Sequence, residues 1–220
     1  VGLTTTDVQV PVLWWRSVGS THTAYATEMF LDEVIAEIGA DQVQFRLDLL
    51  KGHPRHAGVL KLAAEKADWG KPLPEGHHWG VAVHESFHSY VAELAEVSVE
   101  DGEVIVHRVV AAVDVGTPIN PDTIKAQVEG GVGFGLGSVL QEELTLTDGA
   151  VDQGNYDTYL PLRIDRMPKV EVHIVPSTER PTGIGEPGVP PIGPAIGNAV
   201  FRATGQRVRT LPFAKGFKTA

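Results

Sequence analysis

A β-hairpin encoded between residues 97 and 109 constrains the fold of this chain more than any other feature. Valines recur among polar residues on both sides of the dipeptide Asp101-Gly102, at Val97, Val99, Val104, Val106 and Val109. An Asp-Gly pair between two such runs is typical of a type I′ turn. The sequence therefore predicts two antiparallel strands that meet at this turn, within a β region that covers residues 79–113.

A helical pattern precedes the β region. Ser20 or Thr21 is expected to cap a helix that ends at Gly39. The apolar residues of this helix recur at intervals of three and four, and they are Ala26, Met29, Phe30, Val34 and Ile38. This period is typical of a helix with one apolar face.

Two further short helices are predicted before the hairpin. Asp41 and Gln44 match a capping box, in which each side chain bonds to the backbone of the other residue. A third helix is predicted over residues 58–67. Together these patterns indicate that residues 20–68 are helical.

A glycine-rich helix is predicted after the hairpin. Asn120-Pro121 combines a capping side chain with a proline at the first helical position, and the helix is expected to extend to about Glu143. Its glycines at positions 130, 131, 133, 135 and 137 leave a shallow face for close packing against another backbone. Lys125, Gln127 and Glu129 exclude a membrane span. The glycine spacing also does not match the dinucleotide-binding fingerprint.

The last part of the chain, residues 150–212, is expected to hold a strand, a loop and a closing helix. A second Asp-Gly turn at residues 148–149 precedes it, and the strand is predicted over residues 170–175. The helix is expected to start at Pro194 and to end at Gly205. The whole pattern predicts an α+β fold in which β-hairpins and a mixed sheet pack against helices.

Charge and cysteine content exclude several classes of function. The net charge of −10 disfavours binding to nucleic acids and to anionic membrane surfaces. With no cysteine, the chain forms no disulfide, no thiolate nucleophile and no cysteine-ligated iron–sulfur or zinc site. The sequence starts at Val1 and carries neither a signal peptide nor a membrane-length apolar run, so we expect a fragment or a processed product.

A run rich in proline and glycine, residues 181–198, contains a single ionisable side chain, Glu186, between Gly185 and Pro187. Glycines let a backbone approach a ligand closely, and prolines reduce the entropy of a loop. This composition suits a side chain that must be held in place for chemistry. An ordinary surface loop has the same composition, so both interpretations stay open at this point.

The segment His84-Glu85-Ser86-Phe87-His88 matches the H-E-x-x-H motif of zinc metalloproteases. That motif needs a helix, because only there do residues four apart project side by side. The surrounding residues are rich in β-branched and aromatic side chains, which favours a strand. The continuation typical of one zincin class would place Gly at 91 and His at 94, where this chain has Val91 and Leu94. A zinc-dependent hydrolase is therefore the weaker alternative.

Five segments, taken in order, resemble the C-terminal part of the molybdenum-binding subunit of the xanthine oxidase family of hydroxylases. The similarity is greatest to subunits of the isoquinoline 1-oxidoreductase β type. The segments are Trp14–Gly19, Gly80–Phe87, Asp114–Pro121 with Gln127–Gly131, Gly154–Tyr159, and Gly185–Pro187 with Asn198–Pro212. The family's glycine-rich loops that hold the pterin dinucleotide have no counterpart here. The resemblance therefore implies that residues 1–220 are the C-terminal region of a longer subunit, with the α+β fold of aldehyde and xanthine oxidoreductases.

The resemblance also implies roles for individual residues. Glu186 matches the general base that takes a proton from a hydroxide on molybdenum, and Arg16, Gly185 and Gln127 match positions near the cofactor. The substrate pocket is implied to include Val18, Val83, His84, Glu85, His88 and Tyr156. The family usually has Phe-Arg-Gly-Phe-Gly where this chain has Trp-Arg-Ser-Val-Gly, so one aromatic wall of the pocket is missing.

The implied activity is the hydroxylation of an aldehyde or an N-heterocycle, with water as the oxygen source. The implied cofactors are molybdopterin cytosine dinucleotide with molybdenum, and [2Fe-2S] clusters on a small iron–sulfur partner subunit. Further partners would be the N-terminal remainder of the subunit and a small-molecule substrate, but neither a nucleic acid nor a membrane span. We expect a soluble protein of the cytoplasm or the periplasm, and an inactive isolated chain. A non-catalytic binding or assembly domain on the same fold is a further alternative.

Overall fold

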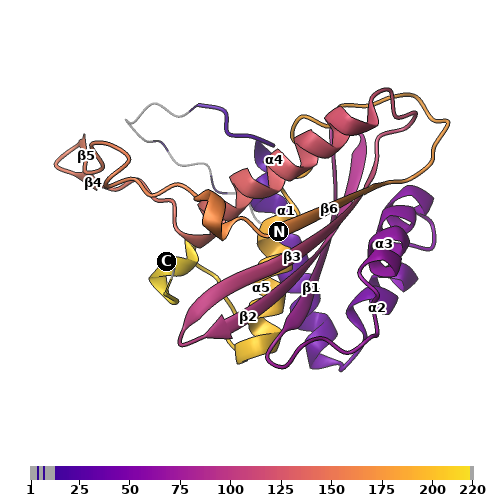
Figure 1. Cartoon of the computed structure of the whole chain (residues 1–220), viewed down its shortest axis with the longest axis horizontal. Helices are drawn as coiled ribbons and strands as arrows, with labels where there is room; N and C mark the ends of the chain where they lie inside the picture. The colour runs from indigo at the N-terminus through magenta and orange to yellow at the C-terminus, as the bar shows by residue number, and fades with distance from the viewer. Residues whose placement is uncertain (1–3, 5–6, 8–12, 219–220) are drawn as a thin grey trace.

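A four-stranded sheet with helices on both faces forms the centre of the computed structural model, which describes residues 4, 7 and 13–218 (Figure 1). The strand order is β1-β2-β3-β6, with three antiparallel strands and a fourth, β6, parallel to β3. The strands are β1 (His78–Ser86), β2 (Ser89–Glu100), β3 (Glu103–Asp114) and β6 (Lys169–Ile174). The predicted α+β class with a mixed sheet is confirmed.

The predicted hairpin joins β2 to β3. Asp101 and Gly102 have φ values of 49° and 82°, the positive pair that a type I′ turn needs. A second turn was not predicted: it joins β1 to β2 at Phe87 (φ 53°) and His88 (φ 62°). These residues carry no turn signature, because neither is glycine, asparagine or aspartate. The single predicted hairpin over residues 79–113 is therefore a meander of three strands.

Helices α2 (Gln42–Leu49) and α3 (Pro54–Lys66) cover one face of the sheet (Figure 1). Half of the predicted capping box of α2 is confirmed, since Asp41 Oδ1 accepts the backbone N–H groups of Val43 at 2.9 Å and Gln44 at 2.7 Å. The return bond, from the N–H of Asp41 to the Gln44 side chain, is not formed among the described residues. The predicted start of α3 at residue 58 is wrong. The helix begins at Pro54, because proline is favourable at the first helical position.

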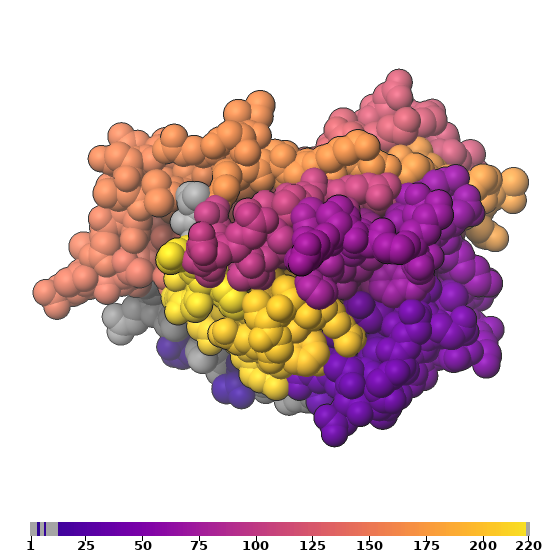
Figure 2. Space-filling view, turned by 60° about the horizontal axis from the view of Figure 1, so that its bottom comes forward, coloured from indigo at the N-terminus to yellow at the C-terminus, as the bar shows by residue number. Residues whose placement is uncertain are grey.

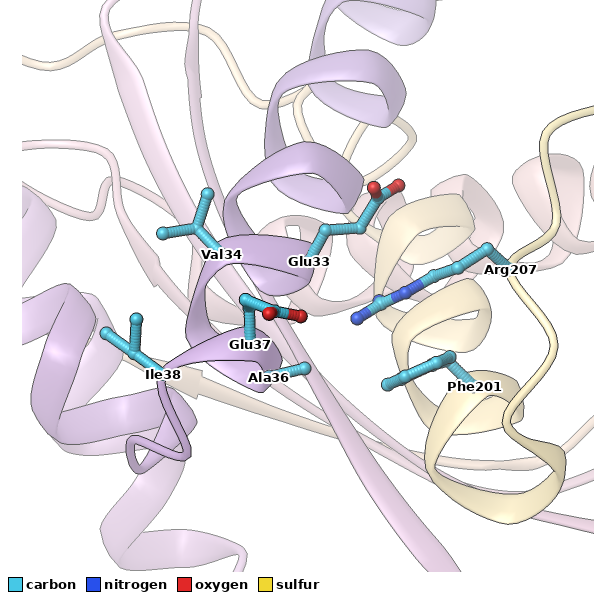
Figure 3. Close-up of a pocket in the computed structure, with 7 residues that line it drawn as sticks. All are labelled: Glu33, Val34, Ala36, Glu37, Ile38, Phe201 and Arg207. Atoms are coloured by element: carbon cyan, nitrogen blue, oxygen red, sulfur yellow. The ribbon is translucent and has the colours of Figure 1, made fainter.

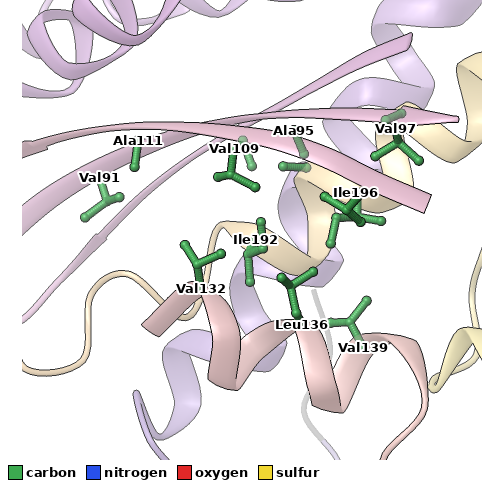
Figure 4. Packing of buried hydrophobic residues seen from close by; sticks show 14 of the residues in the cluster. Val91, Ala95, Val97, Val109, Ala111, Val132, Leu136, Val139, Ile192 and Ile196 are labelled. Carbon is green, nitrogen blue, oxygen red and sulfur yellow. The ribbon is translucent and has the colours of Figure 1, made fainter. Parts of the chain in front are cut away.

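Helices α4 (Pro121–Leu140) and α5 (Ile192–Thr204) cover the opposite face. Figure 4 shows side chains of both helices packed against valines and alanines of the sheet. The predicted cap Asn120 is confirmed, since its Oδ1 accepts the N–H of Thr123 at 2.9 Å. Helix α4 ends at residue 140, three residues earlier than predicted. Helix α5 begins two residues before Pro194 and ends, as predicted, at Gly205, whose φ is 74°.

Helix α1 (Gly19–Glu37) departs from its sequence pattern. Neither Ser20 nor Thr21 caps it, because the helix begins at Gly19, before either of them. Four of the five residues of its predicted apolar period face solvent, and they are Ala26, Phe30 (65% exposed), Val34 (36%) and Ile38 (57%). The buried face instead includes two carboxylates, on Glu28 and Asp32.

Arginines neutralise the two buried carboxylates of α1. Asp32 accepts hydrogen bonds from Arg202 at 3.2 Å and from Arg207 at 3.3 Å, and Glu28 accepts one from Arg46 at 2.9 Å. A buried carboxylate without such partners costs several kcal/mol. Ion pairing, together with the buried Ala24, Met29 and Ile35, therefore specifies how α1 packs against α2 and α5.

Residues 141–168 form an extended arm beside the sheet (Figures 1 and 2). The second predicted Asp-Gly turn is confirmed there, between β4 (Leu146–Thr147) and β5 (Ala150–Val151). Two short 3₁₀ helices follow, Ile164–Arg166 in the arm and Phe213–Lys215 near the C-terminus. Among the described residues, no helix is both long enough and apolar enough to span a membrane.

Glu93 is an unusual residue in the main core. It lies at the centre of β2, opposite Ala82 and Ala111, and it is 0% exposed. Both carboxylate oxygens lack a hydrogen-bond partner among the described residues. Desolvation by burial raises the pKa of this carboxyl well above its usual 4.5.

Substitution of Gly80 tests the close packing of α5 on β1. A Cβ at this position would lie 2.0 Å from the carbonyl oxygen of Ala195, which is backbone and cannot move aside. We expect Gly80→Ala to lower the free energy of unfolding by about 3 kcal/mol. Gly58→Ala is the matched control, because its new Cβ meets open space within α3 and should raise that free energy by up to about 1 kcal/mol. Equal effects of the two changes in urea unfolding would contradict this packing.

Substitution of Glu93 tests its burial through pH dependence. Between the unfolded pKa and the raised folded pKa, the native state binds more protons than the unfolded state, so stability falls as pH rises. We expect Glu93→Gln to remove this loss, which reaches about 1.4 kcal/mol per pH unit in that window. Unfolding measured from pH 4 upward checks this, with the exposed Glu100→Gln as control. Parallel pH profiles of wild type and Glu93→Gln would contradict it.

Candidate functional site

Two segments that are 169 residues apart in sequence meet at Glu186. Arg16, just before α1, donates to the carbonyl oxygen of Gly185 from Nε at 2.9 Å and from Nη2 at 2.6 Å. Ser17 donates its backbone N–H to Glu186 Oε1 at 2.8 Å and its hydroxyl to the carbonyl oxygen of Glu186, also at 2.8 Å. The segment just before α1 therefore holds the loop that carries Glu186 through four hydrogen bonds.

Gln127 of α4 joins the same group. Its backbone oxygen and its side-chain Oε1 accept from Arg16 Nη2 at 3.3 Å and 3.0 Å. The guanidinium carbon of Arg16 lies 5.8 Å from the ring centroid of Phe134, and that ring packs at 4.7 Å against Trp15. The structure thus brings together four predicted residues, Arg16, Gln127, Gly185 and Glu186.

The loop of Glu186 is fixed on both sides. Before it, the N–H of Thr182 bonds to Val115 at 2.9 Å, and the hydroxyl of Ser89 donates to Gly183 at 2.6 Å. After it, the N–H of Val189 bonds to the carbonyl oxygen of Glu186 at 2.9 Å. Gly188 packs onto α4, where an added Cβ would lie 3.1 Å from the Cα of Val128. The interpretation of the run as a held loop, rather than an ordinary surface loop, fits these contacts for residues 181–191, whereas residues 192–198 form the start of α5.

The open side of this cluster suits a ligand that accepts hydrogen bonds. An added Cβ at Gly183 or Gly185 would meet nothing within 4 Å, so the backbone there can be approached. Among the described residues, nothing donates to Glu186 Oε2. Within the described residues, Arg16 Nη1 and the Gln127 amide nitrogen also have no acceptor. This donor set, beside accessible glycines, fits an anionic organic cofactor, and Oε2 is free to accept a proton.

Val18 borders an apolar pocket of about 340 Å³ next to this cluster. Its side chain is 53% exposed, and its φ of 47° follows that of Ser17 at 71°. The pocket is lined by residues that include Trp15, Tyr25, Val139, Pro190 and Leu211. The predicted location of Val18 at a pocket wall fits this geometry, although its contact with substrate stays a prediction.

The other predicted pocket residues lie apart from Glu186 or have no described contact with it. Val83 is buried in the core between the sheet and α3. Burial lowers the pKa of His84, whose neighbour Glu85 has its Oε2 3.6 Å from His56 Nε2. Tyr156 is 71% exposed on the arm, where it borders a separate hollow of about 350 Å³. Pocket roles for these residues stay predictions.

The residues that match the H-E-x-x-H motif do not form a zinc-binding helix. His84 lies on β1, opposite Val91, whereas His88 lies in the turn that follows the strand, so the two are not on one helical face. The expectation that His88 belongs to the strand of His84 is therefore also wrong. Within residues 13–218, no three His, Cys, Asp or Glu side chains are grouped so that they could hold a metal ion.

Another hollow of the described surface lies between α1 and the end of α5 (Figure 3). It measures about 510 Å³, and none of the predicted site residues lines it. The guanidinium carbon of Arg207 lies 3.2 Å from the ring centroid of Phe201, and Arg207 also bonds to Asp32. Arg207 is thus already engaged within the fold.

Sequence reasoning missed Ser17 as a residue of the site. It is 1% exposed and contacts Glu186 through both its backbone and its side chain. The available signal was the serine itself, which stands where the resembling family usually has glycine, in a segment that otherwise matches.

Comparisons with known proteins identify the family of the chain. The chain is 38% identical to a membrane-bound aldehyde dehydrogenase [pyrroloquinoline-quinone] of Gluconacetobacter polyoxogenes, over 90% of this chain and 28% of the relative. It is 36% identical to isoquinoline 1-oxidoreductase subunit beta of Brevundimonas diminuta, over 92% of this chain and 27% of the relative. The chain thus spans less than a third of the length of these relatives.

A solved structure and a family model extend the comparison. The crystal structure of the aldehyde oxidoreductase from Desulfovibrio desulfuricans matches with a TM-score of 0.50 and 27% identity, over 59% of this chain and 16% of that one. The model of the molybdopterin cofactor-binding domain matches residues 28–168, well over half of the chain. The chain therefore belongs to the molybdopterin cofactor-binding domain family, as found in the molybdenum-binding subunits of the xanthine oxidase family.

Proposed function

We propose that this chain is the part of a molybdenum hydroxylase that supplies the general base, Glu186. The full enzyme would hydroxylate an aldehyde or an N-heterocycle with water as the oxygen source. When bound, the molybdenum cofactor supplies the two-electron oxidation chemistry. The family membership supports this class of reaction, and the names of the two relatives indicate an aldehyde and an N-heterocycle as substrates of those proteins.

The observation that carries the proposal is the way Glu186 is held. Oε1 is occupied by the N–H of Ser17, so the carboxylate is oriented before any ligand arrives. Oε2 is left open, and it is the atom that would accept the proton. A general base must lie within about 2.6–3.2 Å of that proton's donor, and a positioned base contributes about 10²–10⁴ in rate.

Arg16 and Gln127 would help to hold the cofactor beside this base. Arg16 has two of its nitrogens on Gly185 and Gln127, which leaves Nη1 without an acceptor among the described residues. A fixed guanidinium of this kind donates to anionic or carbonyl acceptors at low entropic cost. The accessible backbone of Gly185 lets a bulky group approach without a clash.

The pocket beside Val18 would accept the apolar part of the substrate. Its lining is dominated by aromatic and aliphatic side chains, as is usual in small-molecule sites. His84, Glu85 and His88, at one end of β1, are proposed to border the route to it, together with Val83. A contribution of Tyr156 would require the arm of residues 141–168 to face the substrate in the full enzyme.

The finer cofactor and partner assignments belong to the same proposal. The dinucleotide would be molybdopterin cytosine dinucleotide, and electrons would leave through [2Fe-2S] clusters on a small partner subunit. A further part of the large subunit would hold most of the pterin, because the chain matches less than a third of its relatives' length. The isolated chain is therefore expected to be inactive.

Glu186→Gln tests the role of the base in the full-length enzyme. The amide keeps the size and the contact to Ser17 but accepts no proton at neutral pH, so we expect kcat to fall by about 10²–10⁴. Molybdenum content should be unchanged, since the proposal gives this side chain no part in holding the metal. Steady-state kinetics with metal analysis on the same preparations measures both.

The matched control is Glu37→Gln, an exposed carboxylate on α1 that lines the hollow of Figure 3 and is expected to keep wild-type turnover. Near wild-type rates for Glu186→Gln would refute the mechanism. If the purified enzyme carried its cofactor but turned over no aldehyde or heterocycle, a binding or assembly role would be favoured instead.

Metal analysis of the purified full-length protein tests the cofactor. We expect stoichiometric molybdenum, unchanged in His84→Ala, and release of a cytosine nucleotide on acid hydrolysis. Stoichiometric zinc that disappears in His84→Ala would support the hydrolase alternative. A protein that contained pyrroloquinoline quinone and no molybdenum would contradict the proposed cofactor.

A further inference from the structure

Ser17 makes two different bonds to one residue. Its N–H binds the end of the Glu186 side chain, and its hydroxyl binds the carbonyl oxygen of the Glu186 backbone, both at 2.8 Å. A glutamate side chain has three rotatable bonds and loses considerable entropy when it is held in one conformation. A clamp on both ends of this side chain fixes the carboxylate relative to its own backbone.

The hydroxyl bond shares its acceptor with a turn. The carbonyl oxygen of Glu186 also accepts the N–H of Val189 at 2.9 Å, in the turn that leads into α5. Ser17 therefore connects the segment just before α1 with the turn at residues 186–189, which leads into α5. Loss of its hydroxyl would leave that carbonyl with one bond and would free the loop to shift relative to Arg16.

The backbone of Ser17 is strained in a way that serves this clamp. Its φ of 71° lies in the left-handed region, where glycine is favoured and a side chain is not. Such outliers persist where the surrounding structure imposes them, often at functional sites. The serine is also 1% exposed, so its hydroxyl exchanges no bond with solvent. A serine at a position suited to glycine indicates that the hydroxyl offsets the strain.

We propose that Ser17 is the positioning residue of the base: its N–H and hydroxyl together hold Glu186 so that Oε2 faces the reacting proton. This inference rests on the proposed function, because it assigns Ser17 a role in the same reaction. Ser17 itself touches neither the substrate nor the cofactor in this role.

Two variants separate positioning from folding in the full-length holoenzyme. Ser17→Ala removes the hydroxyl and keeps the strained φ, whereas Ser17→Gly removes the hydroxyl and relieves the strain. We expect Ser17→Gly to unfold at a higher temperature than Ser17→Ala. Both should nevertheless lose about tenfold to a hundredfold in kcat, because a small misplacement of a catalytic group has an effect of that size. KM should be unchanged, since substrate binding does not involve the hydroxyl.

A second readout does not depend on the cofactor or on turnover. Hydrogen exchange followed by mass spectrometry should show faster exchange of the Val189 amide in both variants, because its acceptor is no longer held by Ser17. Ser138→Ala is the matched control: its hydroxyl bonds within α4 to Phe134, and its loss should leave kcat and the exchange at Val189 unchanged.

The outcomes distinguish this inference from the proposed function. If Ser17→Gly keeps wild-type kcat, or if the Val189 amide exchanges as in wild type, the positioning role is refuted even when Glu186→Gln is inactive. If Glu186→Gln itself keeps full turnover, the proposed function fails first. In the Glu186→Gln background, Ser17→Gly should cause no further loss of kcat, because the two residues act as one unit.

Discussion

The arrangement of the site depends on the ion pairs that the buried carboxylate of Asp32 forms with two arginines. The carboxylate is fully buried and bonds to Arg202 of α5 and to Arg207 just after it. Removing one partner of such a group leaves an uncompensated charge in the core, which strongly disfavours any other arrangement of the two helices. Ser17 lies just before α1, and Glu186 lies shortly before α5. The ion pairs that align the helices therefore also align the two segments of the site.

Small residues bring the backbones close enough for this arrangement. Gly80 lets α5 lie directly on β1, and Gly131 lets the loop after Glu186 lie on α4, where a Cβ would be 3.0 Å from Gly188. Close backbone contacts of this kind leave little room for adjustment, because protein interiors are packed to crystal-like density. The loop of Glu186 is thus built against a rigid surface, as a catalytic side chain requires.

Much of the fold followed from local sequence. The turn at Asp101-Gly102 and the caps Asp41 and Asn120 are set by the conformational preferences of single residues, which act over a few positions. The turn at residues 87–88 and the buried face of α1 did not follow. The turn contains no glycine, asparagine or aspartate that would mark it. The buried face of α1 depends on Arg202 and other arginines that lie far away in sequence.

The sequence by itself determined the order of the helices, the hairpin at Asp101-Gly102, the isolated carboxylate of Glu186 and, through its resemblance, the family. Only the tertiary structure decided that Ser17 clamps that carboxylate, and that His84 and His88 flank a strand end rather than a metal. The physical reason is range: capping, turn and period preferences act between near neighbours, whereas the contact of Ser17 with Glu186 forms across 169 residues. Such a contact exists only once helices α1 and α5 have packed together.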